Sequence, residues 1–217
     1  MYRYDIINLL ISKNNYKSYL EIGVRDPKEC LDLIKCELKH GVDPGVESKY
    51  EWLHYSQKNA SEFITNFNVT SDEFFQTNQR KYDIIFIDGL HIDEQVERDI
   101  LNSLRFLNEG GSIVLHDCNP PDIWHAREDF DDISTPASYA WNGTVWKSIV
   151  RCRELLPNAS VSVVDTDYGV GIIQITNQLN YFVNDNKYFS YRKFEQNKKY
   201  YLNLISVDEF LQKYIYN

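Results

Sequence analysis

The chain has 217 residues, of which 43% are hydrophobic and 25% are charged, and its formal net charge is −9. This length suits one globular domain that can bury a substantial core. Nucleic-acid backbones are bound by clustered lysine and arginine side chains, so the acidic balance argues against a nucleic-acid partner.

The cysteine pattern and the lack of long apolar runs indicate a cytoplasmic protein. Cys30, Cys36, Cys118 and Cys152 have neither CxxC spacing nor the spacing of a disulfide framework, which favours reduced thiols. No apolar run approaches the ~20 residues that a transmembrane helix needs, and the N-terminus is too polar for a signal peptide. We therefore expect no membrane partner.

Strand and helix patterns alternate from residue 18 to about residue 176. The first half predicts strands over residues 18–23, 40–43 and 64–69, and helices over residues 28–39 and 47–61. Another helix is expected to open near residue 71, where Ser71 or Asp72 can cap its free N–H groups.

The second half begins with the clearest buried strand, residues 82–87, which is continuously apolar after Asp83, as a central parallel strand is. A helix over 92–107 that ends at Gly110 and Gly111, a strand over 112–116 and a helix over 143–156 should follow. The last strands, 161–164 and 170–176, are joined by few residues and therefore predict an antiparallel hairpin.

This alternation predicts a Rossmann-like α/β fold with a doubly wound, seven-stranded, mostly parallel sheet that ends in the antiparallel hairpin. We expect a single domain over residues 1–217, with its core over about 17–176 and a helical appendage over about 178–217. A nicotinamide oxidoreductase is the main rival of this fold class. The hairpin and the absence of a GxGxxG fingerprint argue against it.

Polar residues follow the predicted strands, at the edge where open α/β sheets bind their ligands. They are Glu21 to Asp26, Asp43, Asp72, Asp88 to His91 and His116 to Asn119. Each of them could instead cap a helix or form a turn, but five such groups at successive strand ends favour a ligand site.

Several of these segments resemble motifs of the class I S-adenosylmethionine (SAM)-dependent methyltransferases. The segment Tyr19-Leu-Glu-Ile-Gly23 resembles the first motif of that family, and Gly41-Val-Asp43 is similar to the end of its second strand. Thr70-Ser-Asp72 matches the position that contacts adenine. The segments Ile87-Asp-Gly-Leu-His91, Gly110-Gly111 and His116-Asp117 resemble the metal-dependent O-methyltransferase branch, which includes catechol-type and sugar-modifying enzymes.

The resemblance covers about residues 17–176 and implies the methyltransferase form of the fold, with SAM as cofactor. The cofactor-binding residues that it implies are Glu21, Gly23, Asp43, Ser71, Asp72 and Asp88. Asp43 would accept hydrogen bonds from the ribose hydroxyls, and Gly23 would let the backbone approach the cofactor. Residues 24–27 depart from the glycine-rich turn that is usual in the family.

Asp88 and Asp117 should end neighbouring strands, whose backbones lie about 4.8 Å apart. Two carboxylates so close repel each other unless a cation or a proton lies between them, and oxygen ligands favour Mg²⁺ or Mn²⁺. In the catechol-type relatives an asparagine directly follows the second carboxylate; here Cys118 does, with Asn119 next. The predicted metal ligands are therefore Asp88, Asp117 and Asn119; alternatively, the two aspartates bind SAM or cap loops.

His91 stands three residues after Asp88, where the catechol-type relatives carry a catalytic lysine. Histidine has an ordinary pKa of about 6.5, so its side chain can take a proton from an acceptor hydroxyl near neutral pH. The predicted catalytic residues are thus His91, Asp88 and Asp117, with His116 as the second candidate for the base. The alternative is that His91 only orients a neighbour at the start of a helix.

Residues 119–142 show no clear secondary-structure pattern, as is common in lids and binding loops. We predict that Trp124, Tyr139 and Trp141 bind the acceptor together with His116, because aromatic rings stack on sugar faces. The expected function is metal-assisted O-methylation of a sugar or glycan hydroxyl. The alternatives are a phenol or another small molecule as acceptor, and a non-catalytic SAM- or glycan-binding module. The sequence leaves a homo-oligomer open.

Overall fold

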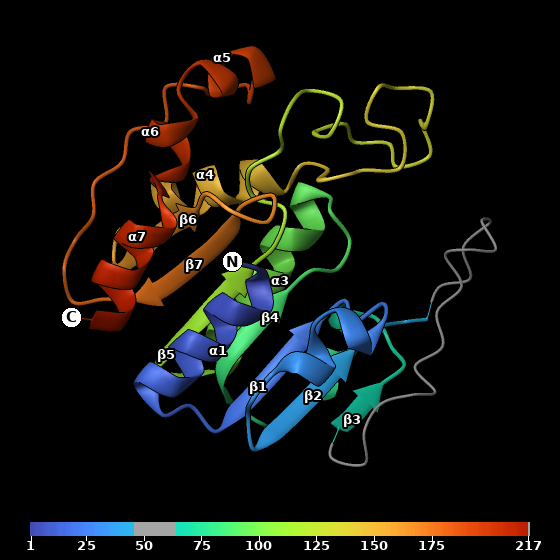
Figure 1. Cartoon of the computed structure of the whole chain (residues 1–217), viewed down its shortest axis with the longest axis vertical. Helices are drawn as coiled ribbons and strands as arrows, with labels where there is room; N and C mark the ends of the chain where they lie inside the picture. Colours follow the sequence, from blue (N-terminus) through green and yellow to red (C-terminus); the bar gives the residue numbers. More distant parts are fainter. Residues whose placement is uncertain (46–63, 217) are drawn as a thin grey trace.

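The computed structural model describes residues 1–45 and 64–216, and it has one eight-stranded sheet in the order β3-β2-β1-β4-β5-β7-β6-β8 (Figure 1). The strands are β1 (Ser18–Ile22), β2 (Leu38–Val42), β3 (Ile64–Phe67), β4 (Tyr82–Ile87), β5 (Leu107–Leu115), β6 (Ala159–Val164), β7 (Val170–Ile175) and β8 (Leu204–Ile205). The helices are α1 (Arg3–Asn14), α2 (Ser71–Thr77), α3 (Asp93–Phe106), α4 (Val145–Leu155), α5 (Tyr191–Gln196), α6 (Lys198–Leu202) and α7 (Val207–Phe210), with helical turns η1 (Pro27–Glu29), η2 (Leu31–Leu33) and η5 (Leu211–Tyr216).

The Rossmann-like α/β prediction is confirmed, including the terminal hairpin. Strands β3, β2, β1, β4 and β5 pair in parallel, and β7 pairs antiparallel with both β5 and β6. The sheet has eight strands where seven were expected. The additional strand β8 pairs in parallel with β6 through Leu204 and Ile205, which lie in the segment predicted to be only helical.

Successive strand residues point to opposite faces of the sheet, and each face is covered by a different set of helices (Figure 1). Ile84 and Phe86 of β4 pack in a cluster with residues of α1, η2 and η5. Ile85 and Ile87 pack in a second cluster, with residues of α2, α3, α4, α5 and α6. Among the helices that the structure describes, none combines the length and apolar character of a membrane span.

The C-terminal segment belongs to both of these clusters and completes the core. Phe194 of α5 and Leu202 of α6 are fully buried on the α4 face, and Phe210 of α7 is fully buried on the α1 face. Trp146 of α4 stacks on Phe194 with ring centroids 4.1 Å apart. Trp146 is therefore a core residue that joins α4 to this segment.

The predicted helix over 28–39 is wrong. The chain forms only the two short turns η1 and η2, and strand β2 starts at Leu38, two residues earlier than expected. Pairing of Ser18 with Leu38 and of Tyr19 with Lys39 takes the end of the predicted helix into the sheet. Strand pairing has overridden a helical pattern of apolar residues here.

Three local boundaries also differ from the prediction. Thr70, rather than Ser71 or Asp72, caps α2, and its side chain and that of Glu73 form a reciprocal capping box. Helix α3 ends at Phe106 without help from glycine, and Gly110 and Gly111 lie inside β5, where the register with β4 is irregular. The helix predicted over 47–61 lies outside the described residues.

Replacement of Trp146 by alanine should cost about 3–5 kcal/mol of unfolding free energy, because it removes a large ring that is 2% exposed. Urea unfolding followed by circular dichroism measures the loss. Leu155→Ala on the same helix is the matched control: Leu155 is 69% exposed, and its truncation should cost less than about 0.5 kcal/mol. Similar losses for the two variants would contradict the proposed role of Trp146.

Candidate active site

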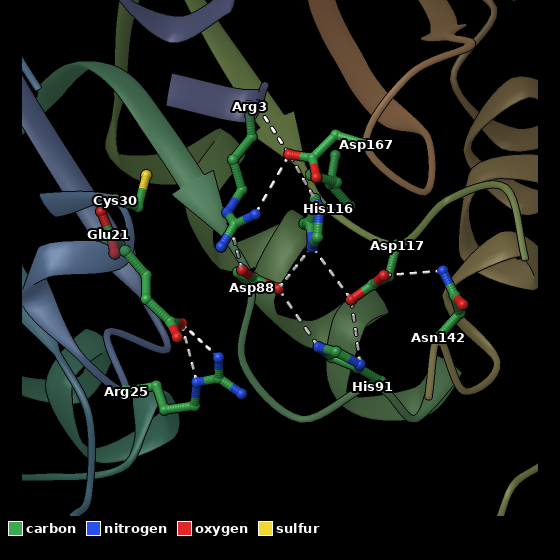
Figure 2. A network of polar contacts seen from close by, with 12 residues as sticks. Arg3, Glu21, Arg25, Cys30, Asp88, His91, His116, Asp117, Asn142 and Asp167 are labelled. Carbon is green, nitrogen blue, oxygen red and sulfur yellow. Dashed lines mark hydrogen bonds and ion pairs between the residues drawn. The ribbon is translucent and has the colours of Figure 1, made fainter. Parts of the chain in front are cut away.

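The carboxyl ends of β4 and β5 bring Asp88, His116 and Asp117 together. Ile87 and Leu115 are register partners at these ends, and the His116 amide donates to the Ile87 carbonyl at 3.1 Å. Asp117 has a φ of +58°, in the left-handed region that non-glycine residues seldom occupy. The backbone turns sharply at Asp117, and its carboxylate lies beside the His116 ring (Figure 2).

Two imidazole rings lie between the two carboxylates (Figure 2). The Nδ1 atom of His116 is 3.3 Å from Asp88 Oδ1 and 3.1 Å from Asp117 Oδ2. His91 contacts the same two oxygens, with Nε2 3.3 Å from Asp88 and Nδ1 3.4 Å from Asp117. The structure thus brings together His91, His116 and both aspartates, as the sequence predicted.

Three residues that were not predicted from the sequence complete this cluster (Figure 2). Arg3, at the start of α1, lies 3.6 Å from Asp88 and 3.2 Å from Asp167, which belongs to the β6–β7 turn. Asn142 donates from its side-chain amide to Asp117 Oδ1 at 2.8 Å. None of these three residues follows a strand of the parallel part of the sheet, so the strand-end pattern did not point to them. Arg3 lies near the N-terminus, Asp167 in a turn and Asn142 directly before Gly143.

The charges in the cluster shift one another's pKa values. Burial alone would raise the pKa of Asp88, but the His116 and His91 rings lower it well below its usual range. Burial lowers the pKa of both histidines, yet the facing carboxylates outweigh it, so the pKa of His91 is raised and that of His116 is raised strongly. The pKa of Asp167 is lowered to about 2 because its contacts with His116 and Arg3 outweigh the effect of burial. Opposite charges thus hold the site together.

Asp88, His116 and Asp117 each offer one ligand atom, and these atoms lie within 4.8 Å of one another. Two members of this group, Asp88 and Asp117, were predicted as metal ligands. Asn119, the third predicted ligand, donates its amide to Asp165 at 3.0 Å. The carboxamide that contacts Asp117 is instead that of Asn142.

The predicted cofactor residues Gly23 and Asp43 lie at the ends of β1 and β2. Gly23 has a φ of +86°, and a Cβ atom there would lie 2.2 Å from the Asp88 carbonyl oxygen. Glycine is therefore required by the close passage of the Asp88 backbone. The Asp43 carboxylate accepts hydrogen bonds from the amides of Arg25 and Gly45, at 2.9 and 2.7 Å. These bonds fix the Asp43 carboxylate beside the loop that follows β1.

The remaining predicted cofactor residues have partners within the protein. Glu21 is 1% exposed, accepts a hydrogen bond from the Tyr19 hydroxyl, and has its pKa raised to about 8 by burial. Ser71 accepts a hydrogen bond from Gln95, and Asp72 pairs with Arg98 at 3.5 Å. Ser71 and Asp72 lie in the first turn of α2.

The segment between β5 and α4 carries the predicted acceptor residues. Trp141 stacks on His91 with ring centroids 5.0 Å apart, whereas Trp124 and Tyr139 are 46% and 44% exposed. Arg127, which the sequence did not single out, organises this segment by donating to five of its backbone carbonyls. The structure therefore places Trp141 at the cluster and the other two aromatic rings at the surface.

A protein-family model described as a methyltransferase domain matches residues 22–118. This stretch runs from the end of β1 to the end of the β5 turn and contains Asp88, His91, His116 and Asp117. This part of the chain is therefore similar to methyltransferase domains. No curated protein matches the sequence of this chain.

Solved structures share the fold of this chain at low sequence identity. A Staphylococcus aureus protein assigned as a caffeoyl-CoA O-methyltransferase is 18% identical, with a TM-score of 0.55 over 79% of this chain and 81% of its own. The SAM complex of the O-methyltransferase TomG from Streptomyces achromogenes is 10% identical, with a TM-score of 0.52 over 79% and 78%. The S-adenosylhomocysteine-bound methyltransferase PaMTH1 from Podospora anserina is 13% identical, with a TM-score of 0.55 over 78% and 76%.

Gly23→Ala should cost about 3 kcal/mol or more of unfolding free energy, because the new Cβ atom would collide with the Asp88 backbone in an already unfavourable φ region. Gly110→Ala is the matched control. Gly110 also has a positive φ, +75°, but nothing lies within 4 Å of the position that a Cβ atom would take there, so only the backbone cost of about 1 kcal/mol should appear. Equal losses in urea unfolding would show that contact with Asp88 is not what requires glycine at position 23.

Proposed function

We propose that this chain is a SAM-dependent O-methyltransferase that acts on a hydroxyl group of a small molecule with the help of a divalent cation. The observation that carries the proposal is the cluster of Asp88, His91, His116 and Asp117 at the carboxyl ends of β4 and β5. Open α/β sheets bind their ligands at this edge, and Gly23 of the proposed cofactor loop packs against Asp88 there.

The residues of the cluster fit a divalent cation. Asp88, Asp117 and Asp167 carry three negative charges, and the Arg3 guanidinium balances one of them. With neutral histidine rings two negative charges remain, which a divalent cation would balance. Asp88, Asp117 and His116 would hold this cation, and when bound it would stabilise the negative charge that develops on the acceptor oxygen.

His91 is the proposed base. Its Nδ1 atom lies 3.0 Å from the Trp141 carbonyl oxygen, which can only accept a hydrogen bond, so in the neutral ring Nδ1 carries the hydrogen. The lone pair is then on Nε2, which can take the proton of the acceptor hydroxyl. Asp88 lies 3.3 Å from Nε2 and would stabilise the protonated ring.

SAM, when bound, would supply a methyl carbon to which the acceptor oxygen bonds while the bond between this carbon and the sulfonium sulfur breaks, with S-adenosylhomocysteine as the leaving group. The residues proposed to bind it are those predicted from the sequence: Glu21, Gly23, Asp43, Ser71, Asp72 and Asp88. Asp43 is held at the end of β2 by two backbone amides, and its carboxylate is the group proposed to accept hydrogen bonds from the ribose hydroxyls.

We infer that the acceptor is a phenol or a related hydroxylated small molecule, in preference to the sugar or glycan that the sequence suggested. The fold neighbours include a protein assigned as a caffeoyl-CoA O-methyltransferase and the O-methyltransferase TomG. The stacked rings of Trp141 and His91 provide a flat aromatic surface beside the two aspartates, on which an aromatic acceptor can lie. The exposed Trp124 and Tyr139 would contact the outer part of the acceptor.

Asp43→Ala should weaken S-adenosylhomocysteine binding about 10- to 100-fold, because a charge-assisted hydrogen bond contributes about 1.5–3 kcal/mol. Isothermal titration calorimetry on the full-length chain measures the change. Glu109→Ala, at the opposite edge of the sheet, is the control and should bind as the wild type does. Unchanged affinity of Asp43→Ala for S-adenosylhomocysteine would refute the proposal that Asp43 binds the ribose. If the wild type binds no cofactor, a binding module without methyl transfer would be favoured.

Asp117→Asn should lower methyl transfer from labelled SAM about 100-fold or more, and a chelator should have the same effect on the wild type, because both weaken the cation. The acceptor panel contains a catechol and a set of free sugars, and only the catechol should become labelled. Asp208→Asn, on the exposed first turn of α7, is the control. Full activity in the presence of EDTA would refute the metal, and His91 alone would then activate the acceptor.

A further inference from the structure

We propose that the cation is a first-row transition ion such as Mn²⁺ or Fe²⁺, bound through a ring nitrogen of His116, and that Mg²⁺ is not the preferred ion. This inference rests on the proposed divalent-cation site and concerns the donor atoms of this chain. An all-oxygen set suits Mg²⁺, whereas an imidazole ligand is more typical of first-row transition ions such as Fe²⁺. The ligand set of this chain is mixed, with two carboxylates and one imidazole.

The distances around His116 Nδ1 are those of neighbouring ligand atoms in a metal shell. With bonds of about 2.1 Å, adjacent ligands lie about 3.0 Å apart in an octahedral shell and about 3.4 Å apart in a tetrahedral one. Nδ1 lies 3.1 Å from Asp117 Oδ2 and 3.3 Å from Asp88 Oδ1. These two distances suit adjacent ligands of one cation, and all three ligand atoms lie within 4.8 Å of one another.

The other nitrogen of the ring is placed so that Nδ1 keeps its lone pair for the metal. His116 Nε2 lies 3.4 Å from Asp167 Oδ2 without forming a hydrogen bond, so a slight shift of the ring would let it donate there when a metal takes Nδ1. The same Asp167 oxygen accepts hydrogen bonds from the backbone amide and guanidinium of Arg3. A carboxylate on the far nitrogen of a metal-binding histidine fixes its tautomer and its orientation. With the hydrogen on Nε2, Nδ1 is free to coordinate.

The His116 side chain has little room to turn away. It is 8% exposed, and the backbone amide of the residue is tied to Ile87 of the neighbouring strand. His91 does not belong to the group of three ligand atoms that lie within 4.8 Å of one another, and its ring stacks on the Trp141 side chain. His116 is therefore the nitrogen donor and His91 remains available for proton transfer.

The test uses Mn²⁺ bound to the full-length chain, because pulsed electron paramagnetic resonance detects an imidazole nitrogen that is directly coordinated to this ion. Nitrogen coupling should appear in the wild type and in His91→Asn, and it should be absent in His116→Asn. Mn²⁺ affinity, measured by titration, should fall about 10- to 100-fold in His116→Asn. Mg²⁺ affinity should change less than about threefold, since Mg²⁺ relies on oxygen ligands and water.

Coupling that persists in His116→Asn, or that is missing in the wild type, would overturn the proposal. Asp167→Asn is a second variant for the case that His116→Asn does not fold. It should keep the nitrogen coupling but bind Mn²⁺ about tenfold more weakly. Unchanged Mn²⁺ affinity would count against the role of Asp167. S-adenosylhomocysteine titration of the same samples tests the proposed function separately. Cofactor binding without nitrogen coupling refutes only the metal assignment, and coupling without cofactor binding refutes only the methyltransferase activity.

Discussion

Three aspartates meet in a small, largely buried space at the carboxyl edge of the sheet, and buried carboxylates are costly unless positive groups face them. The groups that can carry positive charge come from distant parts of the chain: Arg3 from the N-terminal helix, His91 from the turn after β4 and His116 from the end of β5. The salt bridges of Arg3 to Asp88 and Asp167 therefore tie helix α1 and the β6–β7 turn to the centre of the sheet. Arg3 thus places the start of α1 beside the site, because its guanidinium faces the carboxylates of Asp88 and Asp167.

The backbone at the same edge is held as closely as the side chains. Asp117 adopts a left-handed conformation, after which the amides of Cys118 and Asn119 donate to the carbonyls of Gly169 and Tyr168. These bonds lock the end of β5 against the β6–β7 turn and so set where Asp167 meets His116. Rigid support of this kind is what a site needs in order to keep ligand atoms within a few tenths of an ångström of a productive geometry.

The parts of the site that the sequence predicted are those that follow directly from strand ends. Asp88 and Asp117 end two apolar strands, and neighbouring parallel strands end at the same edge of a sheet, so their meeting could be inferred. The positions of Arg3, Asp167 and Asn142 depend on how a helix, a hairpin turn and an irregular segment pack in three dimensions, which no local pattern encodes. The helix expected over 28–39 was lost for a similar reason, since pairing of Leu38 and Lys39 with β1 outweighed local periodicity.

The proposed metal and the proposed base are not independent of each other. Two imidazolium rings and one divalent cation are alternative ways to balance the two negative charges that Arg3 leaves uncompensated. A base must be neutral before it can accept a proton, and the carboxylates of Asp117 and Asp88 raise the pKa of His91, so another positive charge beside them would favour the neutral ring. A cation held by Asp88, Asp117 and His116 would supply this charge, so binding of the metal would also prepare His91 to act as the base.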